Sequence, residues 1–238
     1  MNNVLVLKEI IKVTKTNWRF IFEDPLYDEL KFIPGQLIQL VSKPGQEGSV
    51  VRNYSVASWP DGTNNLELII TYLEGGKMSE YLFKEAAVGD EFLYRGPMGI
   101  FTLPQNLEER DIFFVATGSG ISPFRSMLGY IKQNNIPFKS INLFFGTRTE
   151  KDLLYRDEFE ALQNTFINFN YHPVLSREDV PGMKKGWVHE HYLSFAQLHD
   201  TKPLIYFCGW DRMINTGREL LAKRNYEMTK DIRVEIFG

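Results

Sequence analysis

Backbone N–H groups arranged to bind a phosphate are the first chemistry that the sequence predicts, and they lie in residues 117–123. The continuous apolar run 112–116 predicts a buried strand of a parallel sheet. A glycine-rich turn follows it, and Ser122-Pro123 has the residue types of a helix N-cap and a first helical position. Such a turn presents free N–H groups and a partial positive charge to an anion. The residues of the turn are Thr117, Gly118, Ser119 and Gly120.

The same pattern occurs in α/β domains that bind no ligand, so other segments decide its meaning. In the strand-like segment Arg52-Asn53-Tyr54-Ser55, alternate residues face one side, which places a guanidinium beside an aromatic ring. That pair suits a phosphate joined to a flat ring, although a surface arginine and a barrel tyrosine also explain it. Gly75-Gly76 leads into a short helix and predicts a second backbone anion site, or an ordinary loop. Two such sites in one chain favour an enzyme that binds two nucleotides.

The elements that must position these residues follow one pattern up to residue 103. Short apolar or alternating runs are separated by turn signals such as Pro60-Asp61-Gly62, which predicts an antiparallel barrel or sandwich. The predicted strands are 5–13, 18–22, 37–41, 53–57, 66–72 and 91–95, with a helix over 78–86. We therefore predict a β-barrel domain over residues 1–103.

A different pattern begins at residue 111, where apolar strands alternate with longer helical segments. This alternation predicts an α/β domain with a doubly wound parallel sheet. The predicted strands are 112–116, 140–145, 168–174, 204–208 and 232–237, and the predicted helices are 123–134, 156–163, 188–195 and 211–224. The polar segment 104–110 is the predicted linker, so the nucleotide-binding domain spans 111–238.

The composition of the chain excludes several classes of protein. Its 238 residues include 1 cysteine, which excludes an internal disulfide and a four-cysteine cluster within this chain. No apolar run is long enough to cross a bilayer, and the start Met1-Asn2-Asn3-Val4 lacks the layout of a signal peptide. The net charge of −3 gives no support for nucleic-acid binding. We therefore expect a cytoplasmic protein with no metal site and no membrane or nucleic-acid partner.

Six motifs in order resemble the ferredoxin–NADP reductase family, the flavin-dependent reductases that pair an FAD-binding barrel with a pyridine-nucleotide domain. The resemblance covers nearly the whole chain and implies two cofactors, FAD and NADP (or NAD). The motifs are Pro34-Gly35-Gln36, Arg52-Asn53-Tyr54-Ser55, Gly76 to Ser79, Gly96-Pro97-Met98-Gly99, Thr117 to Pro123, and Cys208-Gly209 with the ending Val234-Glu235-Ile236-Phe237-Gly238.

The resemblance implies a role for each motif residue of the barrel domain. Arg52 would neutralise the FAD pyrophosphate, Tyr54 would stack on the isoalloxazine, and Ser55 would hydrogen-bond near flavin N5. Ile70 and Tyr72 would flank the ribityl and adenosine parts. The remaining FAD ligands are Asn53 from the same strand and, at the pyrophosphate, Gly76, Lys77, Met78 and Ser79.

In the second domain the resemblance implies that the turn after residue 116 holds the pyrophosphate of the nicotinamide nucleotide. Cys208 would lie beside the nicotinamide C4, and Gly209 is a further cofactor-binding residue. Glu235 would position the nicotinamide or supply a proton. Phe237 would cover the other flavin face and move aside for nicotinamide. A lone cysteine and an edge-strand glutamate also have ordinary structural interpretations. The candidate catalytic residues are Ser55, Cys208, Glu235 and Phe237.

The choice between NADPH and NADH depends on the residues after the third strand of the second domain. Ser176, Arg177 and Lys185 resemble the family's NADP-selecting pattern and would bind the 2′-phosphate, with Lys184 as an alternative to Lys185. Trp187 would stack on the adenine, and Arg148 adds a further cation. The Ser-Arg pair also occurs in NADH-using relatives, and consecutive lysines are also typical of a solvated loop. We favour NADPH.

These inferences predict an FAD-dependent oxidoreductase that transfers hydride between NADPH and FAD and single electrons to or from a partner. Because the chain lacks cysteines for its own cluster, that partner would be a separate ferredoxin, flavodoxin or other small acceptor, and we expect a monomer. Two alternatives share most of these residues. They are an NADH-dependent reductase component of an oxygenase system and an electron-transfer subunit without independent turnover.

Overall fold

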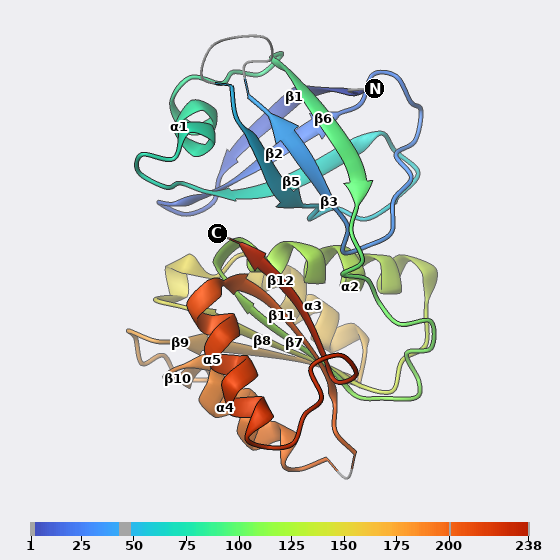
Figure 1. Ribbon diagram of the computed structural model, residues 1–238, viewed down its shortest axis with the longest axis vertical. Coiled ribbons are helices and arrows are strands. Elements are labelled where there is room, and N and C mark those ends of the chain that lie inside the picture. Colours follow the sequence, from blue (N-terminus) through green and yellow to red (C-terminus); the bar gives the residue numbers. More distant parts are fainter. Residues whose placement is uncertain (1–2, 43–48, 200, 238) are drawn as a thin grey trace. The chain divides into compact units, whose positions relative to one another are not determined.

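The computed structural model describes residues 3–42, 49–199 and 201–237, and they divide into two compact units (Figure 1). The first unit comprises residues 1–103 and 122–135. The second comprises residues 104–121 and 136–238. The side chain of Phe237 also lies outside the described residues.

Six antiparallel strands in the described part of the first unit form one sheet, in the order β4-β3-β6-β1-β2-β5. A bridge between Val56 and Leu68 joins the two ends of this sheet, so it closes into a barrel. Alternate residues such as Phe20 and Phe22 fill the interior, as the two-residue period of a strand requires. The predicted antiparallel barrel is confirmed. Its strands are β1 (Asn3–Lys12), β2 (Asn17–Glu23), β3 (Leu37–Val41), β4 (Val51–Ser55), β5 (Asn65–Thr71) and β6 (Glu91–Met98).

The described residues of the first unit include two helices, α1 (Lys77–Lys84) and α2 (Ser122–Asn134). Helix α2 follows the first strand of the other sheet in the sequence, yet it packs against the barrel segment around Trp59. A Cβ on Gly129 of α2 would lie 2.0 Å from the Trp59 ring, so only glycine permits this approach. Trp59 also donates a hydrogen bond to the Gln133 side chain at 2.7 Å.

The second unit contains a parallel sheet whose described strands have the order β10-β9-β8-β7-β11-β12. The chain moves outward from β7 to β10 and then returns to β11, so its direction of progress reverses between β7 and β11. This reversal defines a doubly wound sheet and confirms the predicted α/β fold. The strands are β7 (Ile112–Thr117), β8 (Ile141–Thr147), β9 (Phe169–Leu175), β10 (Lys184–Lys185), β11 (Leu204–Trp210) and β12 (Ile232–Phe237).

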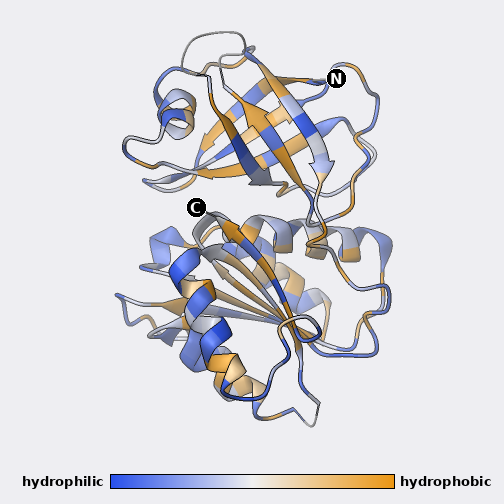
Figure 2. Cartoon of the chain, in the orientation of Figure 1, coloured by the Kyte–Doolittle hydropathy of each residue, from blue (hydrophilic) through white to orange (hydrophobic). Residues whose placement is uncertain are grey.

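Helices cover both faces of this sheet. On one face α4 (Val188–Ala196) and α5 (Asp211–Ala222) bury apolar side chains against Phe113 and Phe207. Hydrophilic and hydrophobic segments follow one another along α5, as expected for a half-buried helix (Figure 2). Helix α3 (Arg156–Thr165) packs against β9, and two short 3₁₀ helices, η1 (Gly118–Ile121) and η2 (Glu150–Asp152), follow β7 and β8. Among the described residues, no helix combines the length and apolar character needed to span a membrane.

Candidate functional site

The predicted flavin ligands on strand β4 differ in how far they are exposed. Arg52 and Asn53 are exposed, the Tyr54 ring packs partly on the barrel core, and Ser55 is buried. The Arg52 guanidinium donates a hydrogen bond to the Val51 carbonyl at 2.8 Å. Burial raises the pKa of the Tyr54 phenol, and the Arg52 charge opposes this shift. The strand therefore offers a neutral aromatic ring next to an exposed guanidinium, which fits a flat ring joined to a pyrophosphate.

The turn before α1 is held by the Ser79 hydroxyl. This hydroxyl donates to the Leu73 carbonyl at 2.9 Å and accepts the Leu73 N–H at 3.1 Å. A Cβ on Gly76 would lie 2.8 Å from the Ser79 Oγ, so glycine is needed there. The N–H groups of Lys77, Met78 and Ser79 begin the helix and have no partner within it. The Ser79 hydroxyl is thus bound to the turn, and the groups left for a phosphate are main-chain N–H groups.

Ile70 and Tyr72 have different surroundings. Ile70 as a whole residue is 1 % exposed inside the barrel, so almost none of its surface is accessible to a ligand. Tyr72 is half-buried, and its hydroxyl lies 3.4 Å from a Glu80 oxygen that also bonds Lys84 at 3.0 Å. The same Glu80 oxygen accepts the Gly75 N–H at 3.2 Å. The sequence interpretation assigned no role to Glu80 or Lys84, although their four-residue spacing in a helix is a recognisable signal.

In the second unit, η1 and the end of β11 meet backbone to backbone. A Cβ on Gly120 would lie 2.2 Å from the Cys208 carbonyl oxygen, and a Cβ on Gly209 would lie 2.3 Å from the Thr117 Oγ1. Gly209 also has a φ of +140°, and Gly118 has a φ of +55°. This packing brings the predicted pyrophosphate turn beside Cys208, at the reversal point of the sheet where ligands of such folds bind.

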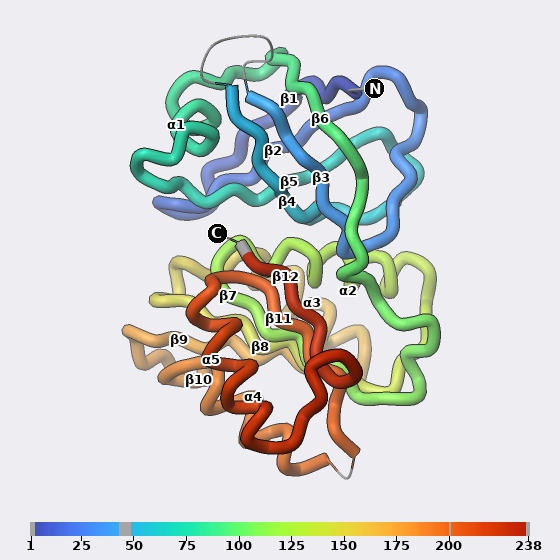
Figure 3. The backbone as a smooth tube through the Cα atoms, in the orientation of Figure 1, coloured from blue at the N-terminus to red at the C-terminus, as the bar shows by residue number. Residues whose placement is uncertain are grey.

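Cys208 and Glu235 are register partners on β11 and β12, which lie side by side at the edge of the sheet (Figure 3). The Cys208 Sγ is 4.0 Å from the Glu235 Oε2. Burial raises the pKa of the Cys208 thiol, and the Glu235 charge raises it further. The group is therefore a protonated thiol and a poor nucleophile, which suits a role in shaping the site. The Phe237 backbone pairs with Trp210, while its side chain and Gly238 lie outside the described residues.

The predicted 2′-phosphate ligands follow the carboxyl ends of β8, β9 and β10. Ser176 donates its N–H and its hydroxyl to the Thr147 carbonyl at 3.0 and 3.2 Å. The Arg177 N–H bonds the Arg148 carbonyl at 2.9 Å, so the two arginines leave neighbouring strands side by side. Lys185 ends β10, next to β9. The structure thus brings Arg148, Ser176, Arg177 and Lys185 to one edge of the sheet.

Trp187 lies near the same edge, at the N-cap of α4, and is 68 % exposed. Two acidic residues to which the sequence interpretation gave no role also lie there. Asp179 pairs with the Lys185 ammonium at 3.0 Å, and both side chains are exposed. Glu178 accepts the Glu150 N–H at 2.6 Å. The edge therefore combines cations that suit a phosphate with an acid that suits a ribose hydroxyl.

Comparisons with known proteins agree with an FAD-binding part followed by a nucleotide-binding part. The family described as "Oxidoreductase FAD-binding domain" matches residues 4–103, and the family described as "Oxidoreductase NAD-binding domain" matches residues 114–219. The fold and the two cofactor sites define a two-domain flavoprotein oxidoreductase. The ferredoxin--NADP reductase B of Sorangium cellulosum is 36% identical over 210 residues, which are 86% of this chain and 84% of that protein. The chain belongs to the ferredoxin–NADP reductase family.

Two further likenesses show the breadth of the family. The anthranilate 1,2-dioxygenase electron transfer component of Acinetobacter baylyi is 36% identical over 199 residues, 82% of this chain. The chain spans only 55% of the length of that relative. A solved structure of a ferredoxin NADP+ reductase from Neisseria gonorrhoeae, with bound FAD and NADP, has a TM-score of 0.83 and 25% identity, covering 99% of this chain and 98% of that one.

Proposed function

We propose that the protein transfers hydride between NADPH and FAD and passes single electrons to or from a ferredoxin or flavodoxin. The observation that carries the choice of NADPH is the edge where Arg148, Ser176, Arg177 and Lys185 gather. Arginine forks bind phosphate oxygens through charge-assisted hydrogen bonds, which a ribose hydroxyl cannot match. The exposed Trp187 supplies an aromatic face for the adenine.

Within this proposal the barrel residues bind FAD. Arg52 and the first N–H groups of α1 neutralise the pyrophosphate, and the Tyr54 ring supports the isoalloxazine. Ser55 lies at the buried end of β4, where its hydroxyl is assigned to flavin N5. When bound, FAD supplies the ability to accept two electrons as hydride and release them singly. The protein contributes binding and alignment of the reacting atoms.

The second unit binds and orients the nicotinamide nucleotide. The turn from Thr117 to Gly120 is assigned to its pyrophosphate, and the neighbouring Cys208 thiol is assigned to the nicotinamide ring. Glu235 holds its carboxylate next to that thiol, where it orients the ring or exchanges a proton. Phe237 is assigned to the flavin face that nicotinamide must occupy. We propose residues 1–103 and 111–238 as the two functional domains, joined by 104–110.

One observation favours a second function, in which the nucleotide is NADH. The Asp179 carboxylate lies at the same edge as Arg177 and already pairs with Lys185. An acidic residue at this place is typical of sites that bind the free 2′-hydroxyl of NAD. The alternative is therefore an NADH-dependent reductase component of an oxygenase system, with the oxygenase or its ferredoxin as acceptor.

Cofactor preference in matched variants tests the proposal. Arg177→Gln should lower kcat/KM for NADPH about tenfold or more and leave that for NADH nearly unchanged, since a charge-assisted hydrogen bond contributes roughly 1.5–3 kcal/mol. Asp179→Asn should raise kcat/KM for NADPH, because Lys185 loses the carboxylate with which it pairs. The rise should be only about two- to threefold, because an exposed ion pair is weak. Arg224→Gln is the control, since its side chain is exposed and, within the described part of the chain, donates to the Leu220 carbonyl at its own helix end. Equal losses with both cofactors in Arg177→Gln would contradict the assignment.

We also propose a cytoplasmic, monomeric protein. The cytoplasmic location is supported by the single cysteine, which suits a reducing compartment, and by the supply of NADPH there. Light scattering after size-exclusion chromatography should give the mass of one chain, and the mass of two chains would overturn the monomer.

A further inference from the structure

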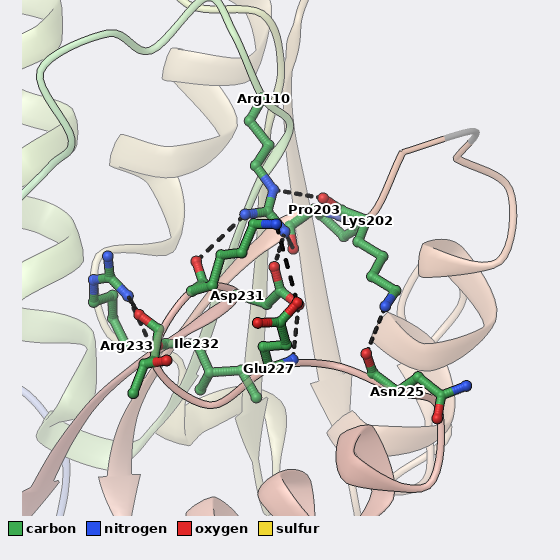
Figure 4. Close-up of polar contacts among 10 residues, drawn as sticks. Arg110, Lys202, Pro203, Asn225, Glu227, Asp231, Ile232 and Arg233 are labelled. Carbon is green, nitrogen blue, oxygen red and sulfur yellow. Dashed lines mark hydrogen bonds and ion pairs between the residues drawn. The ribbon is translucent and has the colours of Figure 1, made fainter.

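Arg110, immediately before β7, joins two segments that are far away in the sequence (Figure 4). Its Nε donates to the Lys202 carbonyl at 2.6 Å, and its Nη2 donates to the Pro203 carbonyl at 3.2 Å. Its Nη1 reaches the Lys230 carbonyl at 3.4 Å. The Nη2 also pairs with the Asp231 Oδ1 at 2.6 Å. One guanidinium thus binds the residues that precede β11 and the residues that precede β12.

The register of three strands begins at the same place. The Leu204 N–H bonds the Asp111 carbonyl at 2.8 Å, which starts the pairing of β11 with β7. The Ile205 N–H bonds the Asp231 carbonyl at 2.9 Å, which starts the pairing of β11 with β12. Arg110 is the chain neighbour of Asp111 and the side-chain partner of Asp231. It therefore holds both starting points together.

The Asp231 carboxylate has few alternatives to this arrangement. It is 3 % exposed, and its second oxygen accepts the Glu227 N–H at 2.8 Å. The Asp231 N–H in turn bonds the Glu227 carbonyl at 2.8 Å, so two hydrogen bonds close the turn 227–231. Removing Arg110 would leave a buried carboxylate without its cation, and the turn would have to move to expose it to water.

Strand β12 is the outermost strand of the sheet that the described residues form, so β11 is the one strand with which it pairs there. A shift of one residue in such a pair reverses the side to which every side chain points. Glu235 would then leave Cys208, and the end of the chain at Phe237 would shift with it. The pairing of Glu235 with Cys208 depends on the position of the amino end of β12.

We propose that Arg110 is a positioning residue for the reaction: through Asp231 it sets the register of β12 and so holds Glu235 against Cys208. The relevance to hydride transfer rests on the function proposed above. The effect on β12 does not, and it can be measured without any nicotinamide nucleotide.

Cys208 makes this measurement unambiguous, because it is the only cysteine of the chain and is buried. We would measure the rate of its modification by a thiol reagent in the FAD-loaded protein and in Arg110→Gln and Asp231→Asn. Arg233→Gln is the matched control, since Arg233 lies on β12 and, among the described residues, donates to the nearby Thr229 and Ile232 carbonyls rather than to Asp231. Each rate is repeated over a series of low urea concentrations, because local opening is insensitive to urea and global unfolding is not.

The expected result is a rate about tenfold or more above wild type in Arg110→Gln, independent of low urea, with Arg233→Gln like wild type. Asp231→Asn should show the same behaviour and serves if Arg110→Gln fails to fold. An unchanged rate, or a rise that follows global unfolding in its urea dependence, would overturn the proposal. In turnover, Arg110→Gln should lower kcat and leave KM for NADPH within about twofold, because the 2′-phosphate edge is untouched. If the wild-type protein itself shows no turnover with NADPH, that result contradicts the proposed function and leaves the inference about β12 standing.

Discussion

Replacing Glu67 by glutamine probes the ion cluster between the barrel and α2. The Glu67 carboxylate on β5 binds Arg19 in bidentate geometry, at 2.7 and 2.9 Å. It also binds the Arg125 Nη1 of α2 at 3.2 Å, and the same Nη1 donates to the Ala57 carbonyl at 3.0 Å. The side chains of Glu67 and Arg125 are 8% and 9% exposed, whereas that of Arg19 is 28% exposed.

These contacts make the two halves of the cluster unequal. Glu67→Gln leaves two guanidinium groups facing one neutral amide, and the buried one has no route to water. We expect a loss of about 3–5 kcal/mol in the free energy of unfolding, the range for a broken buried pair. Arg125→Met removes the Arg125 bonds to Glu67 and to the Ala57 carbonyl, but Glu67 stays paired with Arg19, so we expect a smaller loss of about 2 kcal/mol.

Urea unfolding followed by tryptophan fluorescence and by flavin release measures both losses, and coincident transitions justify a single free energy. Glu29→Gln is the control, because its pair with Lys31 spans 3.9 Å between exposed side chains and should change stability by less than about 0.5 kcal/mol. A loss in Arg125→Met equal to or above that in Glu67→Gln would refute the reasoning.

Two further predictions concern a glycine and a histidine of the second unit. Gly120→Ala should destabilise the protein by about 2–3 kcal/mol, because its Cβ would meet backbone atoms of Cys208 at 2.2 Å. Gly146→Ala, whose nearest neighbours are side-chain atoms at 3.3 Å, should cost less than about 1 kcal/mol in the same urea unfolding assay; equal costs would contradict this. Burial, with help from the Lys184 charge, lowers the pKa of His172 to about 4, so the unfolded chain binds the proton more readily. The free energy of unfolding is therefore unaffected by His172 above about pH 6.5. Between about pH 6.5 and pH 4 it falls by up to about 1.4 kcal/mol per pH unit. His172→Gln should remove most of this slope, and urea midpoints at several pH values that fall equally in both proteins would disprove it.

The strands with continuous or alternating apolar runs could be predicted from the sequence. The run 112–116 became β7 (Ile112–Thr117), and its glycine turn became η1. The strand β10 (Lys184–Lys185) was not predicted, because two lysines carry no hydrophobic pattern. The packing of α2 could not be predicted either. Its glycine, Gly129, matches Trp59 from the other half of the sequence, and no local signal connects them.

The residues of the candidate site could be predicted in type and order, but their partners could not. The motif containing Ser79 was recognisable, whereas the use of its hydroxyl inside the turn depends on the conformation of Leu73. The inward orientation of Ile70 follows from its register in the barrel. Arg110 and Asp231 are 121 residues apart, and their pairing is a property of the folded sheet. Such long-range contacts leave no periodicity in the sequence.

Anaerobic stopped-flow absorbance of the FAD-loaded protein, mixed separately with NADPH and NADH, is the measurement to make first. We predict that NADPH reduces the flavin at least about tenfold faster than NADH at equal, subsaturating concentration. Faster reduction by NADH would instead support the oxygenase-reductase alternative. An oxidised flavin spectrum that neither nucleotide bleaches would contradict hydride transfer by this protein.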